Sequence, residues 1–223
     1  METRAVVLHS GGLDSTVCLL LARELGRKVI SLGIEYGQRH HIELDYAAAQ
    51  CKRFEVERRV LTVKWDKPER PLPTNRAVKD LGKSVSPAFL PARNGLFLML
   101  GCAEAAGVGA TEIWTGINSI NFSGYPDCTP EFLDAFKNMI RIGVPKGPIV
   151  LAPLLKKSKP QIARIASRFG LGSADTWSCY RPQIGPNGFG PCGACDACVL
   201  HDYAWASPGA RKRLRVIRGG HAS

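Results

Sequence analysis

A short loop near the N-terminus holds the first residues whose types and spacing could do chemistry, Ser10-Gly11-Gly12-Leu13-Asp14-Ser15. Gly11 and Gly12 allow the backbone to turn sharply and to approach a phosphate group, while Ser10 and Ser15 add hydroxyl donors. The loop is neither Gly-x-Gly-x-x-Gly nor Gly-x-x-x-x-Gly-Lys-Ser, so it matches neither the dinucleotide fingerprint nor the Walker loop. We therefore expect it to bind phosphate in a different way from either.

A second reactive group lies near the C-terminus and consists of Cys179, Cys192, Cys195 and Cys198. The spacing is Cys-x₁₂-Cys-x₂-Cys-x₂-Cys, and four thiolates at such spacing suit a tetrahedral Zn²⁺. An iron–sulfur cluster would use the same ligands and is the second choice. With four protein ligands a zinc ion has no open position, so we expect a structural role. His201 is a possible substitute ligand.

The elements that must position these groups alternate between strand and helix. Apolar runs predict strands at 5–10, 29–34, 58–64 and 112–117, helical spacing predicts helices at 16–25, 42–54, 95–106, 130–142 and 161–169, and an apolar segment occupies 149–155. Such repeated units predict an α/β fold, a Rossmann-like parallel sheet with helices on both faces. Ligands bind at the carboxyl ends of the strands in these sheets, and the loop at 10–15 lies at such a junction.

Three parts are expected along the chain: a nucleotide-binding domain at 1–174, a small metal-organised module at 175–205 and a basic tail at 206–223. In the module, Gly185, Pro186, Gly188, Gly190 and Pro191 disfavour helix. Residues 65–93 contain five prolines and predict either a long loop over an active site or an ordered surface excursion. The tail is assigned no chemistry.

Composition bounds the remaining possibilities. At 223 residues and 45% hydrophobic, the chain can bury one substantial core. We see no signal peptide and no apolar run of bilayer length, so we expect a soluble, cytoplasmic protein whose cysteines are thiols or metal ligands. A formal net charge of +11 suggests an anionic partner, and it does not distinguish among nucleic acid, nucleotide and an acidic protein.

The loop sequence Ser-Gly-Gly-x-Asp-Ser resembles the signature of the N-type ATP pyrophosphatases, whose fold is of the adenine nucleotide alpha hydrolase type. The resemblance implies that the loop holds the leaving pyrophosphate while AMP is transferred to a carboxylate, carbonyl or similar oxygen. It also implies ATP and Mg²⁺, the latter near Asp14. The cofactor-binding residues expected on this basis are Leu8, His9, Ser10, Gly11, Gly12, Leu13, Asp14, Ser15 and Gly116.

Further segments resemble one subfamily, the QueC enzymes, which are 7-cyano-7-deazaguanine synthases. These segments are Tyr36-Gly37-Gln38-Arg39-His40 followed by Glu43, Arg93-Asn94, Ser123-Gly124-Tyr125-Pro126-Asp127-Cys128, Pro153-Leu154 with Lys159, and the terminal cysteines. The resemblance implies adenylation of the carboxylate of 7-carboxy-7-deazaguanine, attack by ammonia to give an amide, and a second activation that dehydrates the amide to a nitrile. It also implies zinc at the cysteines and a carbon–nitrogen ligase that releases AMP and pyrophosphate.

Residue roles follow from that chemistry. Cations must offset negative charge on ATP and in the transition state, and a histidine can shuttle protons. The catalytic candidates are Arg39, His40, Arg93, Asn121 and Lys159. A guanine-like base needs an acceptor for its N–H groups and an aromatic surface for stacking. Asp127 is the expected acceptor, and the other substrate-binding candidates are Tyr36, Gln38, Phe122, Tyr125 and Tyr180.

Two positions depart from the QueC pattern. The family's usual Pro-Gly-Arg-Asn is here Pro91-Ala92-Arg93-Asn94, and an Asp that usually stands ahead of the Ser123 segment is here Asn121. An amide cannot relay protons as a carboxylate can, so nitrile formation should suffer more than amide formation. The alternative is therefore an enzyme that stops at the amide, similar to a QueC-like branch of antiphage systems that joins a deazaguanine to an amine of a partner protein.

Two other classes compete with this interpretation. A tRNA-thiolating pyrophosphatase would share the loop and the positive charge, but it typically needs a persulfide cysteine or a cluster and often an RNA-binding appendage. The four clustered cysteines are assigned to one metal, and the sequence indicates no such appendage. A non-catalytic zinc-ribbon protein would leave residues 1–174 unexplained. We expect the partners to be the deazaguanine acid, ATP and an amine donor or protein acceptor. We also expect a homodimer and no binding to membranes or nucleic acid.

Overall fold

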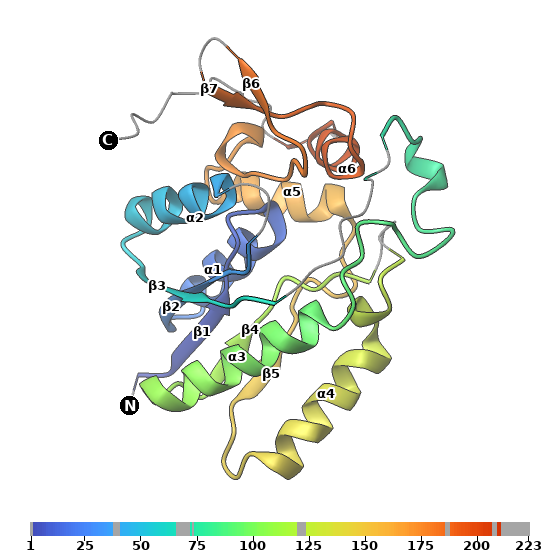
Figure 1. The fold of residues 1–223 in the computed structure, drawn as a ribbon. Coiled ribbons are helices and arrows are strands. Elements are labelled where there is room, and N and C mark those ends of the chain that lie inside the picture. The colour runs from blue at the N-terminus through green and yellow to red at the C-terminus, as the bar shows by residue number, and fades with distance from the viewer. Residues whose placement is uncertain are drawn as a thin grey trace.

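A five-stranded parallel sheet forms the centre of the protein, as seen in a computed structural model that describes residues 2–37, 41–65, 72, 74–119, 124–185, 188–206 and 209–210 (Figure 1). The strands lie in the order β3-β2-β1-β4-β5, and every neighbouring pair is parallel. Their bounds are β1 (Arg4–Leu8), β2 (Lys28–Glu35), β3 (Glu57–Thr62), β4 (Glu112–Trp114) and β5 (Ile149–Leu151). The order reverses beside β1, so the end of β1 lies at the switch point of the sheet.

Helices cover both faces of this sheet: α1 (Leu13–Glu24), α2 (Ile42–Arg53), α3 (Arg93–Val108), α4 (Pro130–Gly143), α5 (Lys159–Arg168) and α6 (Asp196–Trp205). Alternate residues of β1 face opposite sides. Ala5 and Val7 join a buried cluster with α1, α5 and α6, while Val6 joins a second cluster with α3 and α4. Figure 1 shows α3 and α4 together on one side of the sheet. The predicted Rossmann-like α/β fold is confirmed.

The predicted elements of residues 1–169 are all present, with ends that shift by a few residues. β1 ends at Leu8 rather than at residue 10, because the chain turns there into the loop. β4 ends at Trp114, three residues before the predicted end. The apolar segment at 149–155 contains the edge strand β5. The periodicity therefore located the elements, while tertiary contacts decided where each one stops.

The expectation of no helix after residue 175 was wrong for residues 196–205, which form α6. The glycines and prolines that suggested it lie before α6, in and beside the hairpin of β6 (Gln183–Gly185) and β7 (Gly188–Gly190). α6 packs against α5, and its Ala204 and Trp205 belong to the same buried cluster as α1. The cysteine-rich segment thus shares the core of the sheet domain.

The proline-rich segment contributes a short 3₁₀ helix, Val78–Asp80, and an isolated bridge from Thr74 to Cys195. Further 3₁₀ turns occupy Pro126–Cys128 and Ser173–Asp175. Among the described helices, none is long and apolar enough to cross a membrane. The basic tail beyond residue 210 lies outside the described residues.

Candidate active site

A cavity of about 660 Å³ opens at the carboxyl ends of β1, β2 and β4, where the predicted phosphate loop lies. The loop forms one end of the cavity, and aromatic residues around Arg93 form the other. Residues 86–90 of the proline-rich segment line it as well, as that segment was expected to do if it covered an active site. Segments from both halves of the chain therefore meet around one space.

The phosphate loop has the tight backbone that its glycines predicted. Gly11 has φ +84°, and a Cβ atom on it would lie 2.4 Å from the carbonyl oxygen of Glu43 and 2.7 Å from the Ala47 nitrogen. No other residue type fits there without displacing α2. Gly12 is the N-cap of α1, and no side chain caps that helix end. The first N–H groups of α1 therefore point toward the cavity end without a side-chain acceptor, an arrangement that suits an anion.

The two serines of the loop are held together. The Ser10 and Ser15 hydroxyl oxygens lie 3.2 Å apart, and the Ser15 hydroxyl lies 3.2 Å from the Gly12 carbonyl oxygen, to which it donates. At the end of β4, Gly116 allows close approach, because a Cβ atom there would lie 2.9 Å from the Ser15 nitrogen. The β1 and β4 ends thus press against the start of α1.

Asp14 and Lys159 form an ion pair inside the cavity, and each side chain is 20% exposed. Lys159 begins α5, so the pair joins the N-terminal turns of two helices. The second oxygen of Asp14, Oδ1, is buried and has no hydrogen-bond partner among the described residues. An unpaired buried carboxylate oxygen at a phosphate site is a suitable ligand for Mg²⁺. The residues present therefore fit the expected metal–nucleotide complex.

His9 directs its side chain into the protein, away from any phosphate. Its Nδ1 lies 2.9 Å from the Ser31 hydroxyl and its Nε2 lies 2.9 Å from the Gln50 amide oxygen. Burial, with a further contribution from the Arg58 guanidinium, lowers the pKa of His9 to about 3, so the ring is neutral. Leu8 and Leu13, likewise, pack against the core. Of the expected nucleotide-binding residues, these three have side chains engaged elsewhere.

Gln50 also supports the phosphate loop, although the loop motif at 10–15 did not indicate it. Its amide nitrogen donates to the carbonyl oxygens of Gly11 at 3.2 Å and Asp175 at 2.6 Å, while its amide oxygen accepts from Thr16 at 3.0 Å. The side chain is only 4% exposed. A polar residue on the buried face of α2 was the available signal, because buried amides are retained where they are fully hydrogen-bonded.

At the other end of the cavity, Arg93 lies among tyrosines. It hydrogen-bonds to Tyr36 and lies close to Tyr125 and Tyr180. Burial would lower the pKa of Arg93, but these hydroxyl groups outweigh that effect and leave its pKa above the usual value. The Tyr36 ring stacks on Trp65 with centroids 5.8 Å apart. The structure therefore brings four predicted residues together around a flat, aromatic space.

Glu43, on the first turn of α2, also lines this end. Burial raises the pKa of its carboxyl group from its ordinary value of 4.5 to about 7, although the nearby Arg93 acts in the opposite direction. The sequence motif includes this residue, but its chemistry was not assigned. Only the neighbours from other elements show that it is a shielded carboxylate.

Asp127 lies beside the cavity rather than on its lining. The side chain is 6% exposed, and its Oδ2 accepts a hydrogen bond from the Asn94 backbone nitrogen at 3.2 Å. The Asn94 side chain in turn donates to the Asp127 carbonyl oxygen at 3.3 Å. Asp127 therefore holds the start of α3, next to Arg93. Its role as an acceptor for the base stays a prediction.

Several predicted site residues lie outside the described residues, namely Gln38, Arg39, His40, Asn121 and Phe122. The described residues that flank them in the sequence are Gly37 and His41 for the first segment and Ser119 and Gly124 for the second. Gly37 and the Asn118 preceding Ser119 line the cavity.

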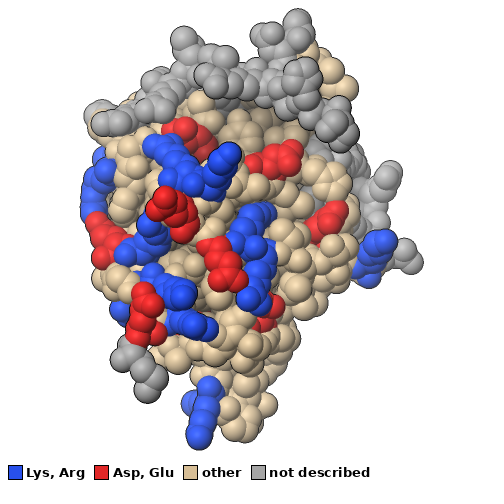
Figure 2. Space-filling model, turned by 90° about the vertical axis from the view of Figure 1, so that its left-hand side faces the viewer, with Lys and Arg blue, Asp and Glu red and all other residues tan. Residues whose placement is uncertain are grey.

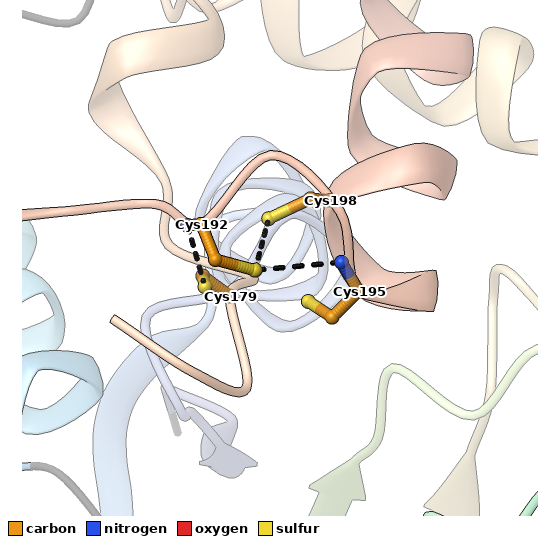
Figure 3. A group of neighbouring side chains, drawn as sticks. All are labelled: Cys179, Cys192, Cys195 and Cys198. Atoms are coloured by element: carbon orange, nitrogen blue, oxygen red, sulfur yellow. Dashed lines mark hydrogen bonds between the residues drawn. The ribbon is translucent and has the colours of Figure 1, made fainter. Parts of the chain in front are cut away.

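The four cysteines meet in space, with their sulfur atoms all within 4.8 Å of one another (Figure 3). Backbone N–H groups of Arg181 and Cys192 lie 3.3 Å and 3.2 Å from the Cys179 sulfur, to which they donate. Such donors stabilise thiolates, and four close sulfur atoms are the donor set of a closed metal site. His201 is not part of this group, and its Nε2 lies 3.1 Å from the Ser173 carbonyl oxygen.

The cysteine cluster is joined to the phosphate loop through Trp177. The Trp177 backbone nitrogen donates to the Gly11 carbonyl oxygen at 3.1 Å, and its indole nitrogen donates to the Cys179 carbonyl oxygen at 3.1 Å. On the other side, Arg76 of the proline-rich segment pairs with Asp196 at the start of α6. A metal at the cysteines would therefore hold in place the segment containing Trp177, which contacts the phosphate loop.

The positive charge does not gather into one patch on the face shown in Figure 2, where basic and acidic side chains alternate. Among the described residues, several basic side chains pair with acidic ones, for example Arg59 with Glu57 and Glu104, and Arg53 with Asp175. A mixed surface of this kind provides no extended track for a phosphate backbone on this face.

Comparison with known proteins identifies close relatives. The family model of the queuosine biosynthesis protein QueC matches residues 4–209. A 7-cyano-7-deazaguanine synthase 2 of Rhodopseudomonas palustris (strain HaA2) is 55% identical over 202 residues, which cover 91% of this chain and 96% of the relative. A 7-cyano-7-deazaguanine synthase of Novosphingobium aromaticivorans is 43% identical over 225 residues, covering 96% and 95%.

Solved structures agree on the fold. A 4-thiouridine synthetase in complex with RNA and bound ATP superposes with a TM-score of 0.50 and 19% identity, covering 75% of this chain and 41% of the other. At this level of identity the likeness concerns the arrangement of strands and helices alone.

Proposed function

This chain belongs to the QueC family, and we propose on that basis that it is an ATP-dependent carbon–nitrogen ligase that converts 7-carboxy-7-deazaguanine to 7-cyano-7-deazaguanine. The observation that carries the proposal is the single cavity shared by the phosphate loop and the aromatic end around Arg93. A nucleotide and a flat heterocyclic acid can therefore meet within one cavity. The names of the relatives supply the identity of the acid.

The first step is activation of the carboxylate. A carboxylate is a poor electrophile until one of its oxygens becomes a leaving group, and transfer of AMP supplies one. The N-terminal N–H groups of α1 and the hydroxyls of Ser10 and Ser15 hold the departing pyrophosphate. Asp14 would hold Mg²⁺, which neutralises phosphate charge when bound. Lys159 reaches the same point and stabilises negative charge as the bond breaks.

Addition of nitrogen follows. Ammonia attacks the activated carbonyl carbon, AMP departs, and an amide forms. A second molecule of ATP transfers AMP to the amide oxygen and releases pyrophosphate. Loss of two protons from nitrogen and departure of AMP with that oxygen then give the nitrile. The family pattern and the named relatives support this endpoint. The four cysteines would hold a structural metal, for which Zn²⁺ is the choice that the thiolate set favours, and they would take no part in the proton transfers.

One feature of the sequence favours a second candidate, in which the reaction stops at the amide. Asn121 stands where the resembled pattern has an aspartate, and a neutral amide cannot accept protons from nitrogen. In that case the acceptor would be ammonia or an amine of a partner protein. Asn121 lies outside the described residues, so this candidate depends on the sequence alone.

Both candidates are tested in one reaction. The purified protein is incubated with 7-carboxy-7-deazaguanine, ATP, Mg²⁺ and ammonium, and mass spectrometry resolves acid, amide and nitrile while AMP is quantified. We expect AMP release that depends on the acid, and nitrile as the final product. Accumulation of amide, with nitrile restored by Asn121→Asp, would instead establish the second candidate. If AMP release does not depend on the acid, the proposed substrate is wrong.

A further inference from the structure

Three acidic residues line the cavity: Asp14, Glu43 and Asp196. Two of them are paired, since Asp14 forms an ion pair with Lys159 and Asp196 forms one with Arg76. Glu43 makes neither a hydrogen bond nor an ion pair through its side chain with any residue that the structure describes. Asp14 keeps one oxygen unpaired, whereas Glu43 has both oxygens available to a ligand.

The surroundings of Glu43 make an unpaired carboxylate costly. The side chain is half-buried in the cavity wall, and burial without hydrogen bonds disfavours its charged form. Arg93 lies near enough to influence it but is engaged with Tyr36. A fold retains such a group at a cavity wall when a ligand supplies the missing donors.

The geometry of this end suits a flat ring with donors on its edge. Tyr36 and Phe97 pack with ring centroids 5.2 Å apart, and Phe89 and Tyr125 pack with centroids 5.6 Å apart. All four side chains line the cavity together with Tyr180. Aromatic walls stack on a heterocycle, and a carboxylate can accept two parallel N–H bonds. A guanine-like ring offers such a pair in its ring N–H and exocyclic amino group.

We propose that Glu43 is the specificity-determining acceptor for the ring N–H and the exocyclic amino group of the guanine-like substrate. This inference rests on the proposed function, because it names the contact by which that site selects its base. It differs from the expectation that Asp127 fills this role, since Asp127 already accepts from the start of α3 and does not line the cavity. Glu43 lies on α2, beside the phosphate loop, so neighbouring residues would contact the base and the nucleotide.

The consequence is discrimination against a base that lacks the amino group. A site built around a hydrogen bond rejects an analogue without the donor, because a buried acceptor is left unpaired. A hydrogen bond to a charged group contributes enough to change kcat/KM by about 10- to 100-fold. The wild-type enzyme should therefore prefer the amino-bearing acid over its desamino analogue by that factor.

The test compares kcat/KM for the two acids in wild-type protein and in Glu43→Gln, with AMP release as the readout. We expect Glu43→Gln to reduce the preference for the amino-bearing acid to about threefold or less, since a neutral amide offers one acceptor where the carboxylate offers two. KM for ATP should stay unchanged. Glu43→Asp keeps the carboxylate and should keep the preference while raising KM for both acids. Asp45→Asn, an exposed acidic position on the same helix turn, is the matched control and should behave as wild type.

The possible failures are distinct. If Glu43→Gln keeps the wild-type preference, the inference is overturned while the proposed function stands. An equal fall in kcat for both acids, with KM unchanged, would also overturn it and would assign Glu43 to proton transfer. If the wild-type protein releases AMP with neither acid, the proposed function itself fails. Melting curves of each variant ensure that only folded protein enters the comparison.

Discussion

The two ends of the cavity are built in different ways. The phosphate end consists largely of backbone from one continuous segment, residues 10–16, pressed against Gly116. The base end consists of side chains from separate elements: Tyr36 after β2, Glu43 on α2, Arg93 on α3, and Tyr125 and Tyr180 from loops. A backbone site is sensitive to any added atom, whereas a side-chain site is sensitive to the chemistry of each group. Substitutions should therefore act differently at the two ends.

The phosphate end depends on the cysteine-rich segment that contacts its loop. We therefore expect the largest effect on stability and activity from loss of the metal. We predict that Cys198→Ser abolishes metal binding and lowers the melting temperature by about 10 °C or more, because the loop-supporting segment loses its closed site. ATP turnover should fall as well, since Trp177 bonds to Gly11. Metal content by mass spectrometry and thermal unfolding measure both effects.

Cys102→Ala provides the matched control, because Cys102 is also buried but lies on α3, away from the cluster. It should keep its metal. Equal metal content in Cys198→Ser and wild type would show that the four cysteines do not form the site, and the link from metal to loop would then lose its basis.

A single added methyl group tests the backbone character of the phosphate end. We predict that Gly11→Ala lowers kcat/KM for ATP at least about 100-fold, because its Cβ atom would collide with the backbone of α2 and displace the loop. Gly26→Ala is the control, because Gly26 also has positive φ but has nothing within 4 Å of the added atom. Steady-state kinetics of both variants measure the difference. Wild-type kinetics in Gly11→Ala would show that the close approach to α2 does not govern this end.

The one cation described at the phosphate end offers a milder test. Lys159→Gln should lower kcat about 100-fold while changing KM for the acid little, because its charge stabilises the transition state for AMP transfer. Lys156→Gln, an exposed lysine three residues earlier, should leave kcat unchanged. A Lys159→Gln enzyme with wild-type kcat would remove this residue from the catalytic set.

At the base end, the dependence of stability on pH provides the corresponding measurement. Because the pKa of Glu43 is raised from 4.5 to about 7, the native state binds more protons than the unfolded state between these values. The free energy of unfolding should therefore decline as pH rises through this window and level off above it. Arg93, Tyr36 and Tyr180 face this group and do not titrate in that range.

Glu43→Gln should remove this decline. The advantage of the variant, which is its free energy of unfolding minus that of wild type, should therefore grow by about 1 to 2 kcal/mol from pH 4.5 to pH 7.5. Denaturant unfolding at several pH values measures it. An advantage that shrinks as pH rises would mean that Glu43 is paired with a cation in solution, contrary to the arrangement described.

The same contrast explains what the sequence could predict. The phosphate loop is local, so its types and spacing were sufficient to indicate Ser10, Gly11 and Gly12, and alternation of apolar runs predicted the parallel sheet. The shielding of Glu43 depends on residues from several distant elements, which no local pattern describes. α6 was missed for a related reason, because nearby glycines and prolines obscured a helix whose stability comes from packing of Trp205 in the distant core.

Substitutions of Asp127 should have the smallest effect. The sequence predicts that this residue accepts hydrogen bonds from the base, whereas in the structure it accepts one from the Asn94 backbone at the start of α3. As an acceptor for the start of α3, it should be replaceable by asparagine at a loss of about 1 kcal/mol, since an amide oxygen still accepts from the Asn94 nitrogen but lacks the charge that favours a helix N-terminus. The preference for an amino-bearing base should survive in Asp127→Asn, because the ring would be read by Glu43. Asp127→Ala should lose more stability, as no acceptor remains. If Asp127→Asn instead keeps full stability and loses the base preference, the two carboxylates exchange roles, and the base end extends beyond the cavity lining to include the start of α3.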